Sequence, residues 1–167
     1  MHEITIQPLL AERFAPFGDV IEVSGPASFQ INGGMCDRYH DLAKLEFAGD
    51  GARANISLAR SRASALPLRL DMMERHPDGS QAFIPLSARP FLVVVAPDAG
   101  GAPGVPLAFL TRPGQGINYH RNVWHGVLTP LDEAADFVIV DRVGPGDNLQ
   151  EHRFDNPYLI VRAREAQ

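Results

Sequence analysis

Residues 91–97 read FLVVVAP, a run of apolar residues that ends at a proline. Valine and phenylalanine favour extended chain, and so short a run, apolar at every position, predicts a strand that is buried on both faces. Residues 137–142, FVIVDR, begin in the same way and end on two charged residues. Two such strands indicate a sheet that packs against a core on one face and against a second sheet or a second subunit on the other.

Short segments separated by turns make up the rest of the chain, which holds 15 glycines and 14 prolines. This pattern predicts a β-sandwich or a closed barrel, because exposed strand edges must be removed. Residues 9–17 look helical, but Pro16 limits the helix to a turn or two. The Gly/Pro-rich stretch 97–106 predicts an exposed loop. We expect further strands at residues 3–7, 19–23, 54–59, 66–73, 81–86, 107–110, 124–128 and 158–162.

Length and charge restrict the class of protein. A chain of 167 residues fits one domain, residues 1–167. Its formal charge of −5 argues against a nucleic-acid partner, which a basic face would hold. The only cysteine, Cys36, excludes an intrachain disulfide and favours a reducing compartment; we expect it to be a small buried hydrophobic residue. No apolar run approaches the roughly 20 residues that span a bilayer. We therefore expect a soluble cytoplasmic protein without a membrane partner.

Several polar residues have the spacing of a shared site. Glu74 and His76 are two apart, so a strand points them to one face while Arg75 points away. Glutamate and histidine supply proton acceptors and donors, and a guanidinium fits a carboxylate. A pocket with these groups suits acid–base chemistry on a small anion. Further candidates by spacing are Arg38 with His40, Gln81, His120 with Asn122, and His125.

Structural interpretations of the same residues are also open. A Glu-x-His pair on a strand is more often a surface pair than a site. Trp124 is expected to pack in the core first and to line a pocket second. Asp141 and Arg142 are either an ion pair that closes a strand or part of a site, and we expect His2 and His152 to be exposed without a role. The sequence has no dinucleotide-binding, Walker, nucleophile-elbow or C-x-x-C motif, which excludes dinucleotide and phosphoryl chemistry.

Seven stretches together resemble the ureidoglycolate lyase (or ureidoglycolate hydrolase) family, a branch of the cupin superfamily. They occur in the family's order and cover about nine-tenths of the chain. Two of them are long and chemically unusual, which argues against a match by chance. The stretches are FAPFGDVIE, INGG, DRYHDLA, ERHPDGSQAFIPL, FLVVVAP, GINYHRNVWH and DFVIVDR.

The resemblance implies an all-β fold, a double-stranded β-helix (cupin jelly-roll barrel) with minor short helices. It also implies a lyase that splits ureidoglycolate into glyoxylate and urea in allantoin and purine degradation. A homodimer is expected as well. In the two cupin motifs, Glu74 and His76 take the places of the two histidines and Gln81 that of the glutamate. Asn122 stands at a glycine position and His125 at the last histidine.

These matches imply roles for the candidate residues. Glu74, His76 and His125 would be catalytic: Glu74 or His125 as the base and His76 as the acid or its partner. The same three would hold a divalent metal if one is present, with nickel implied by the resemblance; a metal-free site stays open because neutral Gln81 is a poor ligand. Arg38 would bind the substrate carboxylate. The other expected substrate-binding residues are Asn32, His40, Gln81, Tyr119, His120 and Trp124.

Two other classes of function remain. One is a different cupin enzyme, such as a sugar epimerase or a metal-dependent oxygenase, although an oxygenase needs a fuller ligand set for iron. The other is a non-catalytic module that binds or senses a small carboxylic acid. Barrel folds host many functions, so only the branch-specific stretches argue for the lyase.

Overall fold

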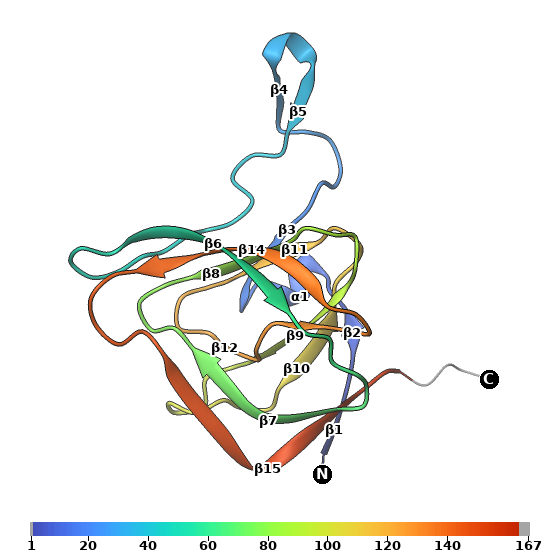
Figure 1. Cartoon of the computed structure of the whole chain (residues 1–167), viewed down its shortest axis with the longest axis vertical. Coiled ribbons are helices and arrows are strands. Elements are labelled where there is room, and N and C mark those ends of the chain that lie inside the picture. Colours follow the sequence, from blue (N-terminus) through green and yellow to red (C-terminus); the bar gives the residue numbers. More distant parts are fainter. Residues whose placement is uncertain (1, 164–167) are drawn as a thin grey trace.

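The protein, described by a computed structural model over residues 2–163, is built almost entirely of strands (Figure 1). Two sheets face each other and curve into a barrel, and a third small sheet projects from it (Figure 1). This confirms the all-β, jelly-roll prediction. No helix within residues 2–163 has the length and apolar character needed to cross a membrane.

The larger sheet has eight strands. Seven follow the order β1-β15-β7-β12-β9-β10-β2, and β13 pairs with β9. The first strand of the chain, β1, lies parallel to the last, β15. The strands are β1 (His2–Thr5), β2 (Gln7–Pro8), β7 (Leu68–Arg75), β9 (Phe91–Ala96), β10 (Leu107–Leu110), β12 (Trp124–His125), β13 (Thr129–Pro130) and β15 (Gln150–Val161).

The second sheet has five strands in the order β3-β11-β8-β14-β6. Its longest pairing is antiparallel, between β14 and β6, which leaves β6 at the sheet edge. The strands are β3 (Gly18–Ile21), β6 (Arg53–Ser61), β8 (Gln81–Pro85), β11 (Gly116–Tyr119) and β14 (Ala135–Val143).

A two-stranded hairpin projects away from both sheets (Figure 1). We call residues 25–40 the arm. It contains β4 (Phe29–Ile31), the 3₁₀ turn η1 (Asn32–Gly34) and β5 (Cys36–Arg38). The one α-helix among residues 2–163, α1 (Ala11–Phe14), is a single turn at the barrel end, as the proline at position 16 predicted.

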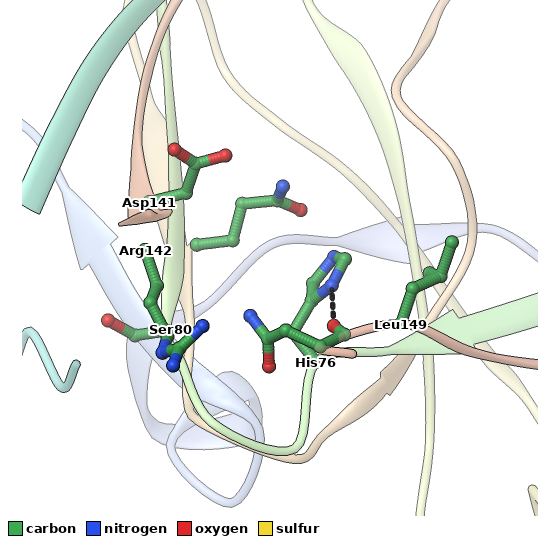
Figure 2. A pocket seen from close by; sticks show the side chains of 7 residues that line it. His76, Ser80, Asp141, Arg142 and Leu149 are labelled. Atoms are coloured by element: carbon green, nitrogen blue, oxygen red, sulfur yellow. Dashed lines mark hydrogen bonds between the residues drawn. The ribbon is translucent and has the colours of Figure 1, made fainter. Parts of the chain in front are cut away.

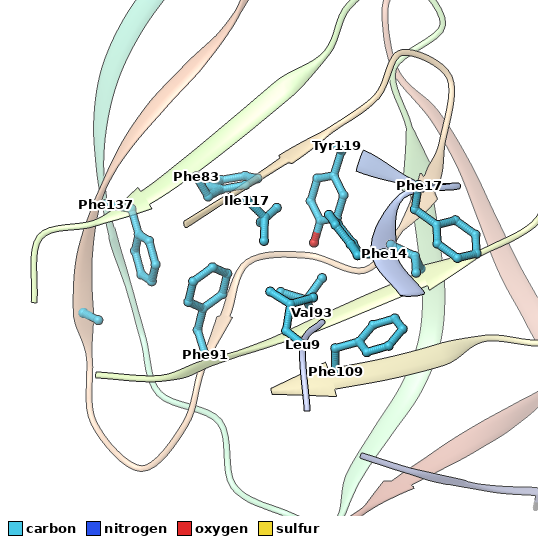
Figure 3. Packing of buried hydrophobic residues seen from close by; sticks show 12 residues of the cluster. Leu9, Phe14, Phe17, Phe83, Phe91, Val93, Phe109, Ile117, Tyr119 and Phe137 are labelled. Carbon is cyan, nitrogen blue, oxygen red and sulfur yellow. The ribbon is translucent and has the colours of Figure 1, made fainter. Parts of the chain in front are cut away.

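The core lies on both sides of β9, all six residues of which are buried. Phe91, Val93 and Val95 join a cluster rich in aromatic rings between the two sheets (Figure 3). Leu92, Val94 and Ala96 join a second cluster with Leu70, Met73 and Trp124. The prediction of a strand that is buried on both faces is therefore confirmed for β9. It is wrong for residues 137–140 of β14, where Val138, Ile139 and Val140 are only half-buried.

Other predicted elements differ from the structure in instructive ways. The strands predicted at 91–96 and 107–110 have the predicted bounds, whereas β4, β5 and β11 were not predicted. β15 begins at Gln150, eight residues before the predicted start, because its first half is polar and lacks an apolar pattern. β12 ends at His125 and not at Leu128. Cys36 is exposed on β5, so the prediction of a buried cysteine is wrong; the projecting arm provides no core for it.

Candidate active site

Three polar side chains meet on the inner side of the larger sheet. β7 points Glu74 inward, and His76, two residues later, follows it to the same side. His125 on β12 lies directly opposite Glu74 in the antiparallel register. One ligand atom of each, a carboxylate oxygen or a ring nitrogen, lies within 4.8 Å of the others. Strand alternation and register thus bring together residues that are 50 positions apart.

Both histidine rings are fixed in one tautomer. His76 Nδ1 lies 2.9 Å from the carbonyl oxygen of Asn148, and His125 Nδ1 lies 3.0 Å from that of Gly126. A carbonyl oxygen only accepts, so each Nδ1 carries the hydrogen and each Nε2 keeps a free lone pair. Both Nε2 atoms are buried without a hydrogen-bond partner among the described residues. This is the arrangement of histidines that bind a metal, with the other nitrogen held by a carbonyl.

Burial shifts the pKa values of His125 and Glu74. His125 is 1% exposed, and burial lowers its pKa to about 3, with a smaller contribution from His76. Its ring is therefore neutral near pH 7. Burial also raises the pKa of Glu74, with a further rise from Glu151 and an opposing effect of His76. Tyr119 stacks on the His125 ring at 4.2 Å between centroids and fixes its plane.

A cavity of about 250 Å³ opens beside the triad (Figure 2). His76 belongs to both the triad and the cavity wall, and its bond to Asn148 is visible in Figure 2. The Oε1 atom of Gln81 is buried there without a partner among residues 2–163. The cavity therefore offers unpaired polar atoms to a small molecule. Its lining residues are His76, Ser80, Gln81, Asp141, Arg142, Asn148 and Leu149.

Asp141 and Arg142 are both in this lining, and no ion pair joins them in the described structure. The Arg142 guanidinium donates to two carbonyl oxygens, Ala48 at 2.7 Å and Pro145 at 2.9 Å. It thereby holds the loop that leads to Asn148 against the barrel. Asp141 accepts a hydrogen bond from the Asn55 amide at 3.2 Å. Of the two interpretations left open for Asp141 and Arg142, these contacts do not bear out the ion pair, and their place in the lining favours a part in the site.

Three predicted substrate-binding residues, Tyr119, His120 and Trp124, lie in the barrel but outside the cavity lining. His120 follows Tyr119, so alternation turns it away from the triad, and its Nε2 lies 3.1 Å from Asp19 Oδ2. Trp124 is 2% exposed and donates from Nε1 to Asp98 at 2.9 Å, and the Arg75 guanidinium lies 4.4 Å from its ring centroid. The expected packing role of Trp124 is confirmed. His152 lies half-buried against the Trp124 ring, not exposed as predicted, whereas His2 is exposed.

Three other predicted residues, Asn32, Arg38 and His40, lie on or at the end of the arm. All three are exposed. The Arg38 guanidinium lies over the Phe29 ring at 5.7 Å, and the His40 ring is tilted against the same ring at 5.3 Å. The arm projects away from the barrel, so the structure does not bring Arg38 to the triad of its own chain (Figure 1).

The sequence interpretation missed three lining residues, Ser80, Asn148 and Leu149. Ser80 stands inside the stretch ERHPDGSQAFIPL and could have been noted beside Gln81. Asn148 holds both His76, through its carbonyl, and the backbone of Asp78, through its side chain at 2.6 Å. No local pattern marks it, because it lies in a loop far along the chain.

Comparison with known proteins points to one family. The profile described as "Ureidoglycolate lyase" matches residues 1–161. A ureidoglycolate lyase of Mesorhizobium japonicum is 60% identical over 96% of this chain and 98% of its own length. One from a Chelativorans species is 58% identical, covering 96% and 97%, and "Ureidoglycolate lyase 2" of Rhizobium meliloti is 57% identical, covering 98% and 100%.

Proposed function

The chain belongs to the ureidoglycolate lyase family, and from this membership we propose that it cleaves ureidoglycolate into glyoxylate and urea. The observation that carries the proposal is the triad of half-buried Glu74, half-buried His76 and buried His125 at the wall of a small polar cavity. Such a cavity suits a small polar substrate held by a few placed groups.

The reaction needs two proton movements. Ureidoglycolate carries a hydroxyl, a carboxylate and the ureido nitrogen on one carbon. A base removes the hydroxyl proton, the C–N bond breaks as the aldehyde carbonyl of glyoxylate forms, and an acid protonates the departing nitrogen to give urea. No water is consumed, so the reaction is an elimination. Placed acid and base groups typically contribute about 10²–10⁴-fold.

We assign the base to Glu74. Burial raises the pKa of its carboxyl group, which makes the carboxylate a better proton acceptor than an exposed glutamate. The alternative base, His125, has a pKa of about 3 and accepts a proton poorly near neutral pH. His125 then serves as a neutral ring whose Nε2 lone pair orients a hydroxyl group or a metal ion.

We assign the proton donor to His76, which lies between the triad and the cavity. Asn148 holds Nδ1 of its ring, so Nε2 is the atom that faces a ligand. The hydroxyl proton taken up by Glu74 would pass to the lone pair of this Nε2 atom, which would deliver it to the departing ureido nitrogen. Gln81 Oε1 has no partner among residues 2–163 and can accept a hydrogen bond from the urea NH₂ group.

The triad also fits a divalent metal. One carboxylate and two neutral imidazoles with free Nε2 atoms form a ligand set for such ions, and both rings have the carbonyl bonds that metal-bound histidines have. Glu74, His76 and His125 would hold the ion, and nickel is the candidate. When bound, it would supply Lewis-acid polarisation of the substrate oxygens.

Further properties are part of the proposal. The enzyme would act on a small molecule in allantoin and purine degradation, as a cytoplasmic homodimer without a nucleic-acid partner. The exposed thiol of Cys36 supports a reducing compartment, and the net charge of −5 disfavours binding to nucleic acid.

An activity assay tests the function. Protein stripped by a chelator is incubated with ureidoglycolate, with and without added nickel, and glyoxylate and urea are followed in equal amounts. We expect both products. Turnover only with nickel would assign the metal to the reaction, and full turnover without it would assign a metal-free site. Binding of ureidoglycolate without products would refute the lyase and favour a small-acid binding module.

A further inference from the structure

The arm is too small to be stable without contacts to another surface. β4 and β5 pair only with each other, and the side-chain hydrogen bonds of the arm in the described structure all end within residues 25–40. An isolated two-stranded hairpin is at best marginally stable in water. The arm also exposes large apolar side chains, with Phe29 44% and Met35 87% exposed. These features indicate that another surface covers it.

The same chain offers an uncovered apolar face on the outer side of the five-stranded sheet. Ile56 and Leu58 of the edge strand β6 are 74% and 73% exposed. Their cross-strand neighbours on β14 are Val140 and Val138, so four aliphatic side chains adjoin one another. A long edge strand with an apolar middle is a ready site for association. We call these four residues the outer face.

The amount of exposed surface supports a second copy as the occupant. The chain exposes 9625 Å², whereas a compact monomer of 18.2 kDa exposes about 8,100 Å². The excess of roughly 1,500 Å² is more than the roughly 800 Å² that each partner buries in a standard interface. A two-fold dimer uses one self-complementary surface, and a chain that carries both the arm and the outer face can form it.

Charge complementarity gives the arm a role in the site. The Arg38 guanidinium has no carboxylate partner in the described structure, and the cavity contains the Asp141 carboxylate and lies beside Glu74. Arg142 is the one cation among the described lining residues, and two of its nitrogen atoms already bind backbone carbonyls. A substrate carboxylate in this cavity therefore lacks a free two-pronged donor, and Arg38 is such a donor.

We propose that two copies pair through their outer faces and that each arm carries Arg38 to the cavity of the other copy, where it binds the substrate carboxylate. This proposal rests on the lyase activity proposed above. Each active site is then composite, with Glu74, His76 and His125 from one chain and Arg38 from its partner.

Complementation between two inactive variants tests the composite site. Chains with Arg38→Ala and chains with Glu74→Gln are produced together with different tags, and only mixed dimers are purified. Arg38→Ala alone is expected to raise KM on the order of 100-fold, because the anion loses its charged partner. In the mixed dimer one of the two sites is intact, so about half of the wild-type activity returns. If Arg38 acted within its own chain, neither site would be intact and no activity would return.

A matched control uses two changes in the same barrel. Mixed dimers of Glu74→Gln and His125→Ala chains contain no intact site in either arrangement, so they should stay inactive. Activity in this control would show that the changes are not disabling, and it would overturn the interpretation of the complementation.

A second measurement does not depend on catalysis. Cys36 is the only thiol and lies on the arm, and Leu149 lines the cavity. With Leu149→Cys, a short bis-maleimide should join two chains into a covalent dimer on a denaturing gel. With Cys36→Ser added, that product should disappear. A wild type that sediments as a monomer, or cross-linking that does not need Cys36, would overturn the proposal even if the lyase activity is present. If the activity is absent but this cross-link forms, the dimer stands and the proposed function fails.

Discussion

At the scale of single residues, two backbone carbonyls determine what the site can do. Asn148 and Gly126 each take the Nδ1 hydrogen of one histidine, which leaves both Nε2 lone pairs directed to the same space as the Glu74 carboxylate. No side chain in the sequence marks the position of either backbone carbonyl. The chemistry of the triad therefore depends on backbone positions that only the fold provides.

Substitution of Glu74 by glutamine should abolish turnover while the fold survives. The amide has the same shape but cannot accept the hydroxyl proton, so we expect kcat to fall about 10²–10⁴-fold. Because burial disfavours the carboxylate, the neutral variant should be at least as stable as the wild type in urea unfolding. Glu3→Gln on the exposed strand β1 is the control and should change neither quantity. Wild-type kcat in Glu74→Gln would place the base elsewhere.

The sequence predicted part of this site because alternation is a local rule. Glu74 and His76 are two residues apart on one strand, so their shared direction follows from spacing alone. The position of His125 opposite Glu74 is a matter of register between β7 and β12, and the family resemblance, not spacing, selected it. The sequence did not predict Asn148 and Ser80 as lining residues, because their positions depend on loops whose path no periodic pattern encodes.

At the scale of elements, apolar strands were predictable and polar ones were not. β9 and β10 were predicted with correct bounds because their apolar runs follow a proline and end at Pro97 and at the polar Thr111. β11 pairs with β3 and β8 and is entirely buried, yet its four residues, GINY, are too few to form a pattern. The first half of β15 alternates exposed and half-buried positions and is held by pairing with β7. Its strand character comes from its partner and not from its own composition.

Truncation in the core between the sheets should be costly. Phe137 on β14 is fully buried and meets the Phe91 ring edge-on at 5.1 Å between centroids. Phe137→Ala removes these contacts and leaves a cavity, so we expect the free energy of unfolding to fall by about 3–5 kcal/mol. Urea denaturation at neutral pH measures it. Val105→Ala, at a side chain that is 65% exposed, should change it by less than about 0.5 kcal/mol. Equal losses in the two variants would show that this core is not close-packed.

The junction between the arm and the barrel should respond to acid. Asp19 on β3 accepts from the Lys44 backbone at 2.9 Å and from the Asn118 amide at 3.0 Å. Burial raises the pKa of Asp19, but the hydrogen bonds from Asn118, Lys44 and His120, together with the charge of His120, outweigh it, and the net pKa is lowered. A lowered pKa in the folded state means that Asp19 stabilises the protein above the unfolded pKa and that this stabilisation is lost as the pH falls through the folded value.

Asp19→Asn should therefore reduce the acid sensitivity of folding. Between about pH 6 and about pH 3, the free energy of unfolding should fall less in the variant than in the wild type, because one proton fewer is taken up on unfolding. Urea titrations across this range measure the two slopes. Asp155→Asn, at an exposed position on β15, serves as the control. A variant whose slope equals that of the wild type would show that Asp19 does not contribute.

At the scale of the whole molecule, the barrel and the arm differ in what can stabilise them. The barrel has two buried clusters on either side of β9. The arm has no core, and β6 leaves an apolar edge uncovered. A dimer removes both exposed features at once, so the stability of the whole should depend on association.

Thermal stability should therefore rise with protein concentration. If unfolding separates two chains, a 100-fold increase in concentration stabilises the dimer by about 2.7 kcal/mol, which for two chains of this size raises Tm by about 4 °C. Leu58→Arg places a charge in the outer face and should remove this dependence and sediment as a monomer. Val127→Arg, at a side chain that is 55% exposed outside the arm and the outer face, should keep it. A wild-type Tm that is constant over this range would mean that each barrel folds alone, in which case the arm must be stable without a second copy.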